Sequence, residues 1–251
     1  MSGHSKWSTI KRQKGAEDKK RGLVFSKLAN AITIAVREGG GTTDPASNFK
    51  LRLMMDKAKA ANMPKDNIQR AIERAIGSNA QSFEEITFEG YAPGGIAIMI
   101  VCATDNRART MQAVKMALER AGGTFGARGS VAYMFNPTGN ISMEHVGQSE
   151  DTILNDTVES GADDFEIEDG VVEVYTGATN LHSTKEALTA KGYNVSDAEI
   201  ILKPTLHVAV TDAELAKKIV SLMETLEDLE DVQKVYANFD IPQHILQEAM
   251  S

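Results

Sequence analysis

A change in hydrophobic periodicity near residue 79 constrains the fold of this chain more than any other sequence feature. Before that point, apolar residues recur at steps of three and four, as they do on the buried face of an amphipathic helix. After it, short segments alternate apolar and polar residues, which is typical of strands with one buried face. The sequence therefore predicts an α+β chain, with a helical N-terminal part followed by α/β structure.

The helical part is expected to form a three-helix bundle behind a basic arm. The first helix is predicted over about residues 17–37, and Asp44-Pro45 is expected to cap and begin the second. The third helix is predicted to bury Ile68, Ile72 and Ile76, which follow one another at four-residue steps. The single cysteine lies in an apolar run, and we interpret it as a small buried hydrophobe.

Two ferredoxin-like α/β domains are predicted after the bundle. The second of them, over residues 137–205, shows the order β-α-β-β-α-β, with Asp169-Gly170 as a hairpin turn. The first begins with two strands, a helix, a glycine-rich loop at residues 122–129 and a strand at 131–135. The closing strand-helix-strand of the chain is too small to hold a core alone, so we expect it to complete this first domain.

The predicted helices and strands divide the chain into three domains, one of them discontinuous. The closing segment consists of a strand at residues 206–210, a helix capped by Asp212 and a strand at 232–239. The expected division is residues 1–80 for the arm and bundle, 81–136 plus 206–251 for the discontinuous domain, and 137–205 for the inserted one.

Charge is distributed unevenly along the chain, although the net charge of −8 would by itself argue against nucleic acid. Residues 1–80 hold 16 Lys and Arg against 7 Asp and Glu, whereas the remainder holds 11 against 28. A basic end joined to an acidic body favours a molecule that attaches to phosphates through one end. A solvated surface is the alternative interpretation of such a charge run.

The candidate nucleic-acid-binding residues gather at the start of the chain. Cations there would neutralise phosphates, and an aromatic side chain beside them could stack on a base or ribose. The only tryptophan could equally pin the arm to the core of the helical domain, and the two roles are compatible. The predicted contact residues are His4, Lys6, Trp7, Lys11, Arg12, Lys14, Lys19, Lys20, Arg21, Lys27 and Lys65.

Sequence signatures of catalysis, nucleotide binding and metal binding are not found. The P-loop, the dinucleotide-binding glycine pattern, the zinc-protease helix and the nucleophile elbow do not occur. The histidines are scattered without ligand spacing, and the acidic stretch 163–169 does not fit a calcium loop. We therefore expect no enzyme activity, no metal and no cofactor.

Several linked motifs are distributed along nearly the whole chain. They are Gly3-His4-Ser5-Lys6-Trp7, Phe25-Ser26-Lys27-Leu28, Ala61-Asn62-Met63-Pro64-Lys65-Asp66-Asn67-Ile68, Glu89-Gly90-Tyr91-Ala92-Pro93-Gly94-Gly95, Asp105-Asn106-Arg107-Ala108-Arg109-Thr110 and Gly129-Ser130-Val131. Together they resemble the YebC family, whose mitochondrial relatives activate translation of a cytochrome oxidase subunit. The resemblance implies a three-domain regulatory protein.

Two functions remain open at this point. The resemblance implies a transcriptional regulator that binds DNA, but the third predicted helix offers little beyond Arg70 and Arg74 to read base edges. The alternative is a ribosome-associated translation factor that binds ribosomal RNA or tRNA and eases elongation, which suits a basic arm on a compact domain. In either case we expect a monomer in the cytoplasm, with nucleic acid or the ribosome as partner and without a membrane.

Overall fold

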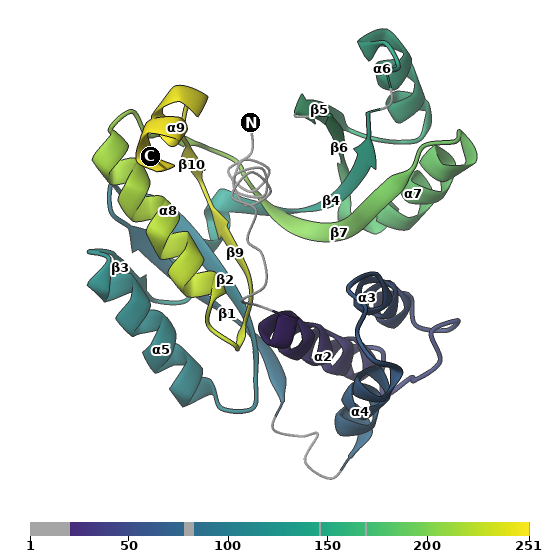
Figure 1. Cartoon of the computed structure of the whole chain (residues 1–251), viewed down its shortest axis with the longest axis horizontal. Helices are drawn as coiled ribbons and strands as arrows, with labels where there is room; N and C mark the ends of the chain where they lie inside the picture. The colour runs from purple at the N-terminus through teal and green to yellow at the C-terminus, as the bar shows by residue number, and fades with distance from the viewer. Residues whose placement is uncertain (1–20, 78–82, 146, 169, 251) are drawn as a thin grey trace. The chain divides into compact units, whose positions relative to one another are not determined.

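The computed structural model describes residues 21–77, 83–145, 147–168 and 170–250 (Figure 1). The described residues form two compact units. The inserted unit comprises Tyr133–Ala209 with Asn238–Asp240, and the larger unit comprises the rest. The chain is α+β, with a helical N-terminal domain followed by α/β domains. Within the described residues, no helix is both long enough and apolar enough to span a membrane.

The N-terminal part of the larger unit consists of three helices, α2 (Arg21–Glu38), α3 (Phe49–Ala60) and α4 (Lys65–Ile76). Their core includes Ile32, Leu51 and Ile72, all of which are buried. Ile76, expected on the buried face of α4, is 59% exposed because it lies in the last turn of its helix. The predicted bundle is therefore present, and its core ends one turn earlier than the periodicity indicated.

Helix α3 begins four residues later than the sequence predicted. Asp44 accepts a hydrogen bond from the Ala46 N–H at 2.9 Å and so forms a turn rather than a helix cap. Asn48 is the cap, because its side-chain oxygen accepts from the Leu51 N–H at 3.0 Å. Its amide nitrogen also donates to the Ala35 carbonyl at 2.9 Å, which ties the start of α3 to α2.

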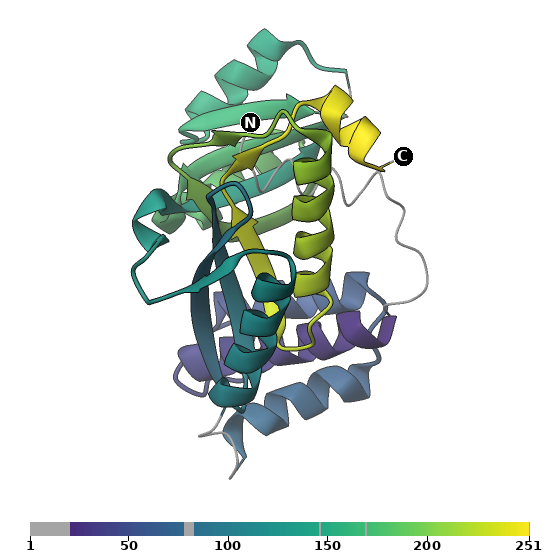
Figure 2. The same ribbon diagram turned by 90° about the vertical axis from the view of Figure 1, so that its left-hand side faces the viewer.

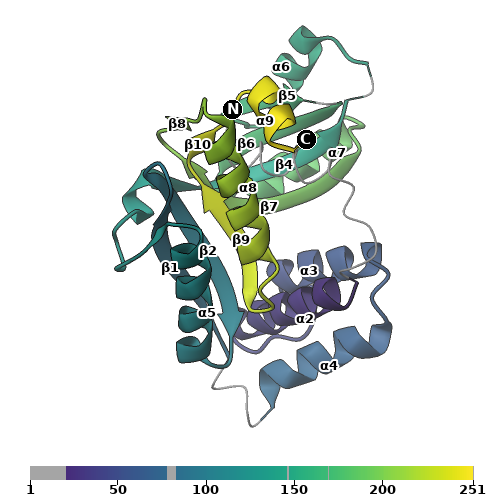
Figure 3. The ribbon, with the colours of Figure 1, turned by 60° about the vertical axis from the view of Figure 1, so that its left-hand side comes forward.

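The first sheet of the larger unit has the strand order β3-β1-β2-β9 and is antiparallel throughout. Its members are β1 (Glu84–Ala92), β2 (Ile96–Thr104), β3 (Thr124–Gly126) and β9 (Val232–Ala237). Helices α5 (Arg107–Arg120) and α8 (Ala213–Glu227) cover one face of this sheet (Figures 2 and 3). As predicted, the last long strand joins the sheet that began more than 130 residues earlier.

Two expectations about this part of the chain were wrong. Residues 131–135, predicted as a strand, instead contain the 3-10 helix η2 (Ala132–Met134), and β3 lies in the segment predicted as a loop. The reason is that the Val131 and Ala132 N–H groups donate to the Glu89 carboxylate and therefore cannot join a strand ladder. The sequence also gave no indication of α9 (Gln243–Met250), which packs beside α8.

The inserted unit has the predicted order β-α-β-β-α-β and the strand order β5-β6-β4-β7. Its elements are β4 (Phe135–Glu144), α6 (Glu150–Glu159), β5 (Asp164–Glu168), β6 (Val171–Gly177), η3 (Ala178–Asn180), α7 (Leu181–Ala190) and β7 (Val195–Pro204). The predicted strand at residues 206–210 is only β8 (Val208–Ala209), which pairs in parallel with β10 (Phe239–Asp240). The exact boundaries of the three domains stay a prediction.

The two four-stranded sheets share one spatial plan despite different chain orders. In the inserted unit, α6 connects β4 to β5 with β6 lying between these two strands. In the first sheet, α5 connects β2 to β3, and β1 lies between these two strands. The position of β1 in the first sheet therefore corresponds to the position of β6 in the inserted unit, although β1 is the first strand of its sheet along the chain. The first sheet is therefore a permuted ferredoxin-like arrangement, into which the inserted unit is placed between β3 and α8.

Candidate nucleic-acid interface

Most of the predicted contact residues lie outside the described residues. Arg21, Lys27 and Lys65 are described, and the rest stay a prediction from the sequence. Those outside are His4, Lys6, Trp7, Lys11, Arg12, Lys14, Lys19 and Lys20.

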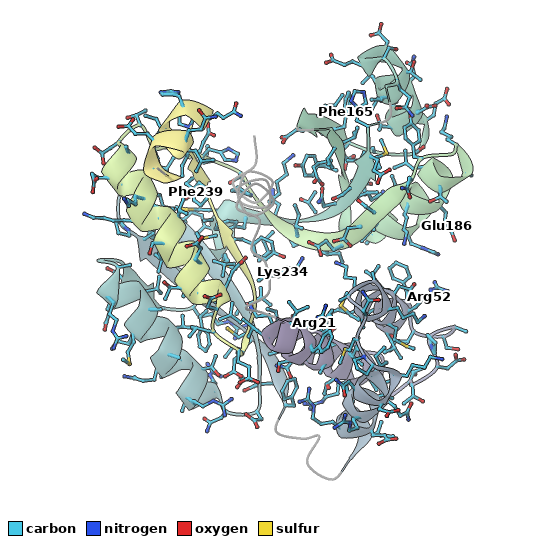
Figure 4. All side chains as sticks on the ribbon, in the orientation of Figure 1. Arg21, Arg52, Phe165, Glu186, Lys234 and Phe239 are labelled. Atoms are coloured by element: carbon cyan, nitrogen blue, oxygen red, sulfur yellow. The ribbon has the colours of Figure 1, made fainter. Side chains whose placement is uncertain are left out.

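Arg21 and Lys65 are exposed at the first residues of two helices, whereas Lys27 has an internal contact. Arg21 begins α2 and Lys65 begins α4 (Figure 4 labels Arg21). A cation at a helix N-terminus opposes the macrodipole, so Lys65 does not stabilise α4 in this way. Lys27 donates to the Glu227 carbonyl at 2.5 Å, where a cation favourably meets the C-terminus of α8. Lys27 thus anchors α2 to α8.

Helix α3 carries a set of cations that the sequence reasoning did not include. Arg52 and Lys59 lie seven residues apart on one side, and Lys50 and Lys57 repeat this spacing (Figure 4 labels Arg52). A seven-residue repeat of cations around buried Leu51 is the signal that could have identified them. The four cations face only one acidic residue of the same helix, Asp56.

The ion pairs on α3 leave its cations accessible to phosphate. Lys59 contacts Asp56 at 3.0 Å, with both side chains more than 60% exposed. Lys50 contacts Glu38, and both of these side chains are about half exposed. Exposed pairs of this kind contribute at most about 1 kcal/mol, so a phosphate group can replace the carboxylate partner. The Arg52 guanidinium lies 5.5 Å from the Phe49 ring and keeps its polar edge exposed.

Helix α4 is poorly suited to reading base edges. Asp66 and Glu73 on its exposed surface repel phosphate, and the exposed Arg70 donates to the Asn67 side chain and to the Asp66 carbonyl of the same helix. The Arg74 guanidinium donates to Asn30 and Thr33, each at 2.8 Å, and lies over the Phe83 ring. Burial lowers the pKa of this guanidinium, and the nearby Asp105 raises it in part. Arg74 therefore joins α4 to α2 and to the start of the first sheet.

The motif at residues 89–95 is bound to the motif at 129–131 by a buried carboxylate. Glu89 is 4% exposed and accepts three backbone N–H groups, from Gly129 at 2.6 Å, Val131 at 2.8 Å and Ala132 at 2.9 Å. Burial alone would raise the pKa of Glu89, but these donors and the charge of Arg128 outweigh it and lower the pKa. Tyr91 adds a hydrogen bond to the Ser130 carbonyl at 3.0 Å.

A second motif, at residues 105–110, is joined to the start of β9. Arg109 donates to Asp231 at 3.0 Å and to Asp105 at 3.0 Å, and Thr110 donates to Asp231 at 2.6 Å. The hydrogen bond and charge of Asp231 raise the pKa of Arg109. Beside this cluster lies a polar hollow of about 460 Å³, bounded by α2, α4 and α5. These motif residues bond chiefly to one another, so they organise the fold.

The cysteine of the chain is not accessible as a nucleophile. Cys102 is fully buried, and burial raises its pKa to about 12, so the reactive thiolate is suppressed. Among the residues that the structure describes, no group of three or more His, Cys, Asp or Glu side chains could hold a metal ion.

Comparisons with known proteins place the chain in a family. Residues 5–78 match the family described as TACO1/YebC protein N-terminal domain, and residues 83–239 match the TACO1/YebC second and third domain. The chain therefore belongs to the TACO1/YebC family. The resemblance inferred from the sequence motifs is confirmed.

Individual relatives align over nearly their full lengths. A probable transcriptional regulatory protein of Pseudomonas fluorescens is 47% identical, with 98% of each chain covered. A protein of the same name from Roseiflexus castenholzii is also 47% identical, over all of both chains. The crystal structure of a conserved hypothetical protein from Aquifex aeolicus matches with a TM-score of 0.82 and 40% identity, covering 90% of this chain and 93% of the other.

Proposed function

We propose that this protein is a non-enzymatic regulator of gene expression that binds nucleic acid through the basic surface of its first 80 residues. The observation that carries the proposal is the charge contrast, 16 cations against 7 anions in residues 1–80 and 11 against 28 in the remainder. Each phosphate that a cation neutralises releases counterions, which gives affinity without reading sequence.

The described part of the N-terminal region supports this proposal. Residues 21–77 contain ten Lys and Arg and five Asp and Glu, a net charge of +5. The cations of α3 are mostly exposed, whereas Lys27 and Arg74 have internal hydrogen bonds. The proposed surface thus consists of the N-terminal arm and the exposed cations of α2, α3 and the start of α4.

Transcriptional control through DNA is the first candidate, because the relatives are named probable transcriptional regulatory proteins. Ribosomal RNA is the second candidate, and the surface of α4 favours it. An HTH protein reads bases with exposed side chains of one helix, but that surface of α4 carries Asp66 and Glu73. Structured RNA is recognised by shape and phosphate contacts and requires no such helix.

A charge-reversal experiment tests the proposed surface. Arg52→Glu with Lys59→Glu removes two phosphate contacts of α3, so the slope of log affinity against log salt should become shallower by about two units. Lys11→Glu, Arg12→Glu and Lys14→Glu test the arm in the same way. The matched control is Lys217→Glu with Lys218→Glu, two exposed residues of α8. Equal losses in the α3 variant and the control would refute the α3 surface.

Sedimentation of the native protein from gently lysed cells separates the two candidates. Co-migration with ribosomes or their subunits that RNase abolishes would support the translation factor. A protein that stays at the top of a low-salt gradient, and that shifts a DNA duplex in the same buffer, would support DNA as the target. Absence of both interactions would refute the proposed function.

A further inference from the structure

The inserted unit is the most acidic part of the chain. Residues 133–209 contain 14 Asp and Glu but only three Lys and Arg, a net charge of −11. Such a surface repels phosphate, so nucleic-acid binding gives it no direct use. Its charge is opposite to that of residues 1–20, which carry six Lys and Arg against Glu17 and Asp18.

The acidic side chains of this unit lie on two different faces. On the helical side, Lys191 contacts Asp156 at 2.8 Å and Glu159 at 2.6 Å, so a cation of the unit itself balances these carboxylates. Helices α6 and α7 pack on that side, around Ile141, Val174 and other core residues. The strand registers place the alternate residues of β4, β5, β6 and β7 on the opposite side.

We call this opposite side the acidic face, and all four strands place carboxylates on it. Glu166 on β5 stands directly opposite Glu173 on β6, and like charges in that position destabilise a sheet. The only cation that the registers place there is Lys203, which lies 3.4 Å from the centre of the Tyr175 ring and 3.6 Å from Asp164. The carboxylates of the acidic face include Glu144, Asp164, Glu166, Glu173, Asp197 and Glu199.

Two details at the centre of the acidic face indicate that it is covered. Glu173 is only 6% exposed, although both helices of the unit pack on the other side of the sheet. Asn140 and Ser142 donate to the Glu173 carboxylate at 2.9 and 2.7 Å. Because the Asn140 amide nitrogen donates to Glu173, its oxygen points elsewhere, and this buried acceptor has no hydrogen-bond partner among the described residues. A segment with N–H donors would satisfy the Asn140 acceptor, and the negative charge of the face favours a cationic one.

We infer that the acidic face is the docking site for the basic N-terminal arm of the same chain, residues 4–20, when nucleic acid is absent. This inference rests on the proposed function, in which the arm binds phosphates. The acidic face and a nucleic acid are both polyanionic, so they compete for the same cations of the arm. The acidic face binds the arm until a nucleic acid displaces it. Twenty extended residues span about 65 Å, well beyond the roughly 20 Å width of a four-stranded sheet. Tethering also raises the local concentration of the arm to the millimolar range.

The consequence is competitive self-inhibition. If the arm is docked for about 90% of the time, the apparent affinity for nucleic acid is about tenfold weaker than the intrinsic affinity. A ligand that binds only the arm, weakly and without specificity, would compete poorly with the acidic face. A ligand that also binds the exposed cations of α2, α3 and the start of α4 would displace the arm from the acidic face. The acidic unit thereby raises selectivity without contacting nucleic acid.

A paramagnetic label on the full-length protein tests the docking directly. Ser2→Cys allows a nitroxide to be attached, because native Cys102 is fully buried. We expect line broadening of amides in β4, β5 and β6 at low salt and its loss at about 0.5 M salt, where the Debye length is only a few ångströms. Glu166→Gln with Glu199→Gln should abolish the broadening. Glu150→Gln with Glu186→Gln, on α6 and α7, should preserve it (Figure 4 labels Glu186).

The outcomes separate docking from nucleic-acid binding. Absent broadening, or broadening unchanged in the Glu166/Glu199 variant, would overturn the inference. Broadening that depends on protein concentration would identify a second copy as the occupant and would overturn it also. If broadening is present but no DNA duplex or structured RNA removes it, the docking stands and the proposed function fails. If both hold, the Glu166/Glu199 variant should bind a DNA duplex about tenfold more tightly than the control variant.

Discussion

The Glu89 carboxylate offers the sharpest test of how the family motifs hold the fold together. Its Oε1 accepts from the Gly129 N–H, and its Oε2 accepts from both Val131 and Ala132. In Glu89→Gln, the amide oxygen can serve two of these donors at best, and the new NH2 group then faces the third. One charge-assisted bond is lost and two are weakened, which together should cost about 3 kcal/mol.

Hydrogen exchange of the Val131 and Ala132 amides measures this loss locally. A change of about 3 kcal/mol corresponds to roughly a hundredfold faster exchange. Glu84→Gln provides the matched control, since it makes the same chemical change at an exposed position of the same strand. If exchange at Val131 and Ala132 accelerates less than about threefold, or equally in both variants, the carboxylate does not hold this segment.

The pH dependence of stability provides a second signature of the same contact. The pKa of Glu89 is lowered from 4.5 in the folded protein, so its ionised form stabilises the native state. That contribution is fully present above about pH 4.5 and is lost as the pH falls through the depressed folded value. The urea midpoints of the wild type and Glu89→Gln should therefore converge in acid. A gap that stays constant down to the lowest accessible pH would contradict the assignment.

Two further predictions concern residues away from the proposed interface. Asn48→Ala removes the cap of α3 and a buried hydrogen bond to α2, so it should lower the free energy of unfolding by about 2 kcal/mol. Urea titrations followed by circular dichroism measure this change. A loss below about 0.5 kcal/mol would contradict the capping role. Cys102 should react with a thiol reagent only after unfolding, because it is fully buried and its pKa is about 12; rapid labelling in native buffer would show that its strand opens.

Local sequence signals predicted most of the secondary structure. Asp212 caps α8 as expected and accepts from the Leu215 N–H at 2.6 Å, and Asn106 caps α5 by accepting from the Arg109 N–H at 3.1 Å. β5 and β6, the strands on either side of the predicted turn, pair antiparallel up to Glu168 and Val171, as a hairpin requires; Asp169 itself lies outside the described residues. These signals act over two to four residues, so the sequence alone is sufficient to identify them.

The errors arose where a distant residue determines the local structure. Val131 and Ala132 look like part of a strand, but their N–H groups bond to Glu89, more than 40 residues earlier. Ile76 continues the apolar repeat of α4 beyond the core, because the periodicity does not reveal where neighbouring helices end. Propensity and periodicity contain no information about such long-range partners.

The sequence predicted the positive charge of the candidate interface better than it predicted the individual residues that form it. The density of cations identified the start of the chain, while the dispersed cations of α3 required the helix geometry to bring Arg52 and Lys59 to one side. Lys27, in contrast, was predicted as a contact residue, but its ammonium group donates an internal hydrogen bond to the Glu227 carbonyl. Its predicted role in binding nucleic acid stays a prediction.

The most direct test of the central claim is the salt dependence of nucleic-acid binding by the wild-type protein. Fluorescence anisotropy with a DNA duplex and with a structured RNA, between about 50 and 200 mM salt, would give both slopes in one experiment. If six to ten phosphates are engaged, the affinity should fall by roughly 10³–10⁵ over this range. A flat salt response for both ligands would contradict binding through the basic N-terminal surface.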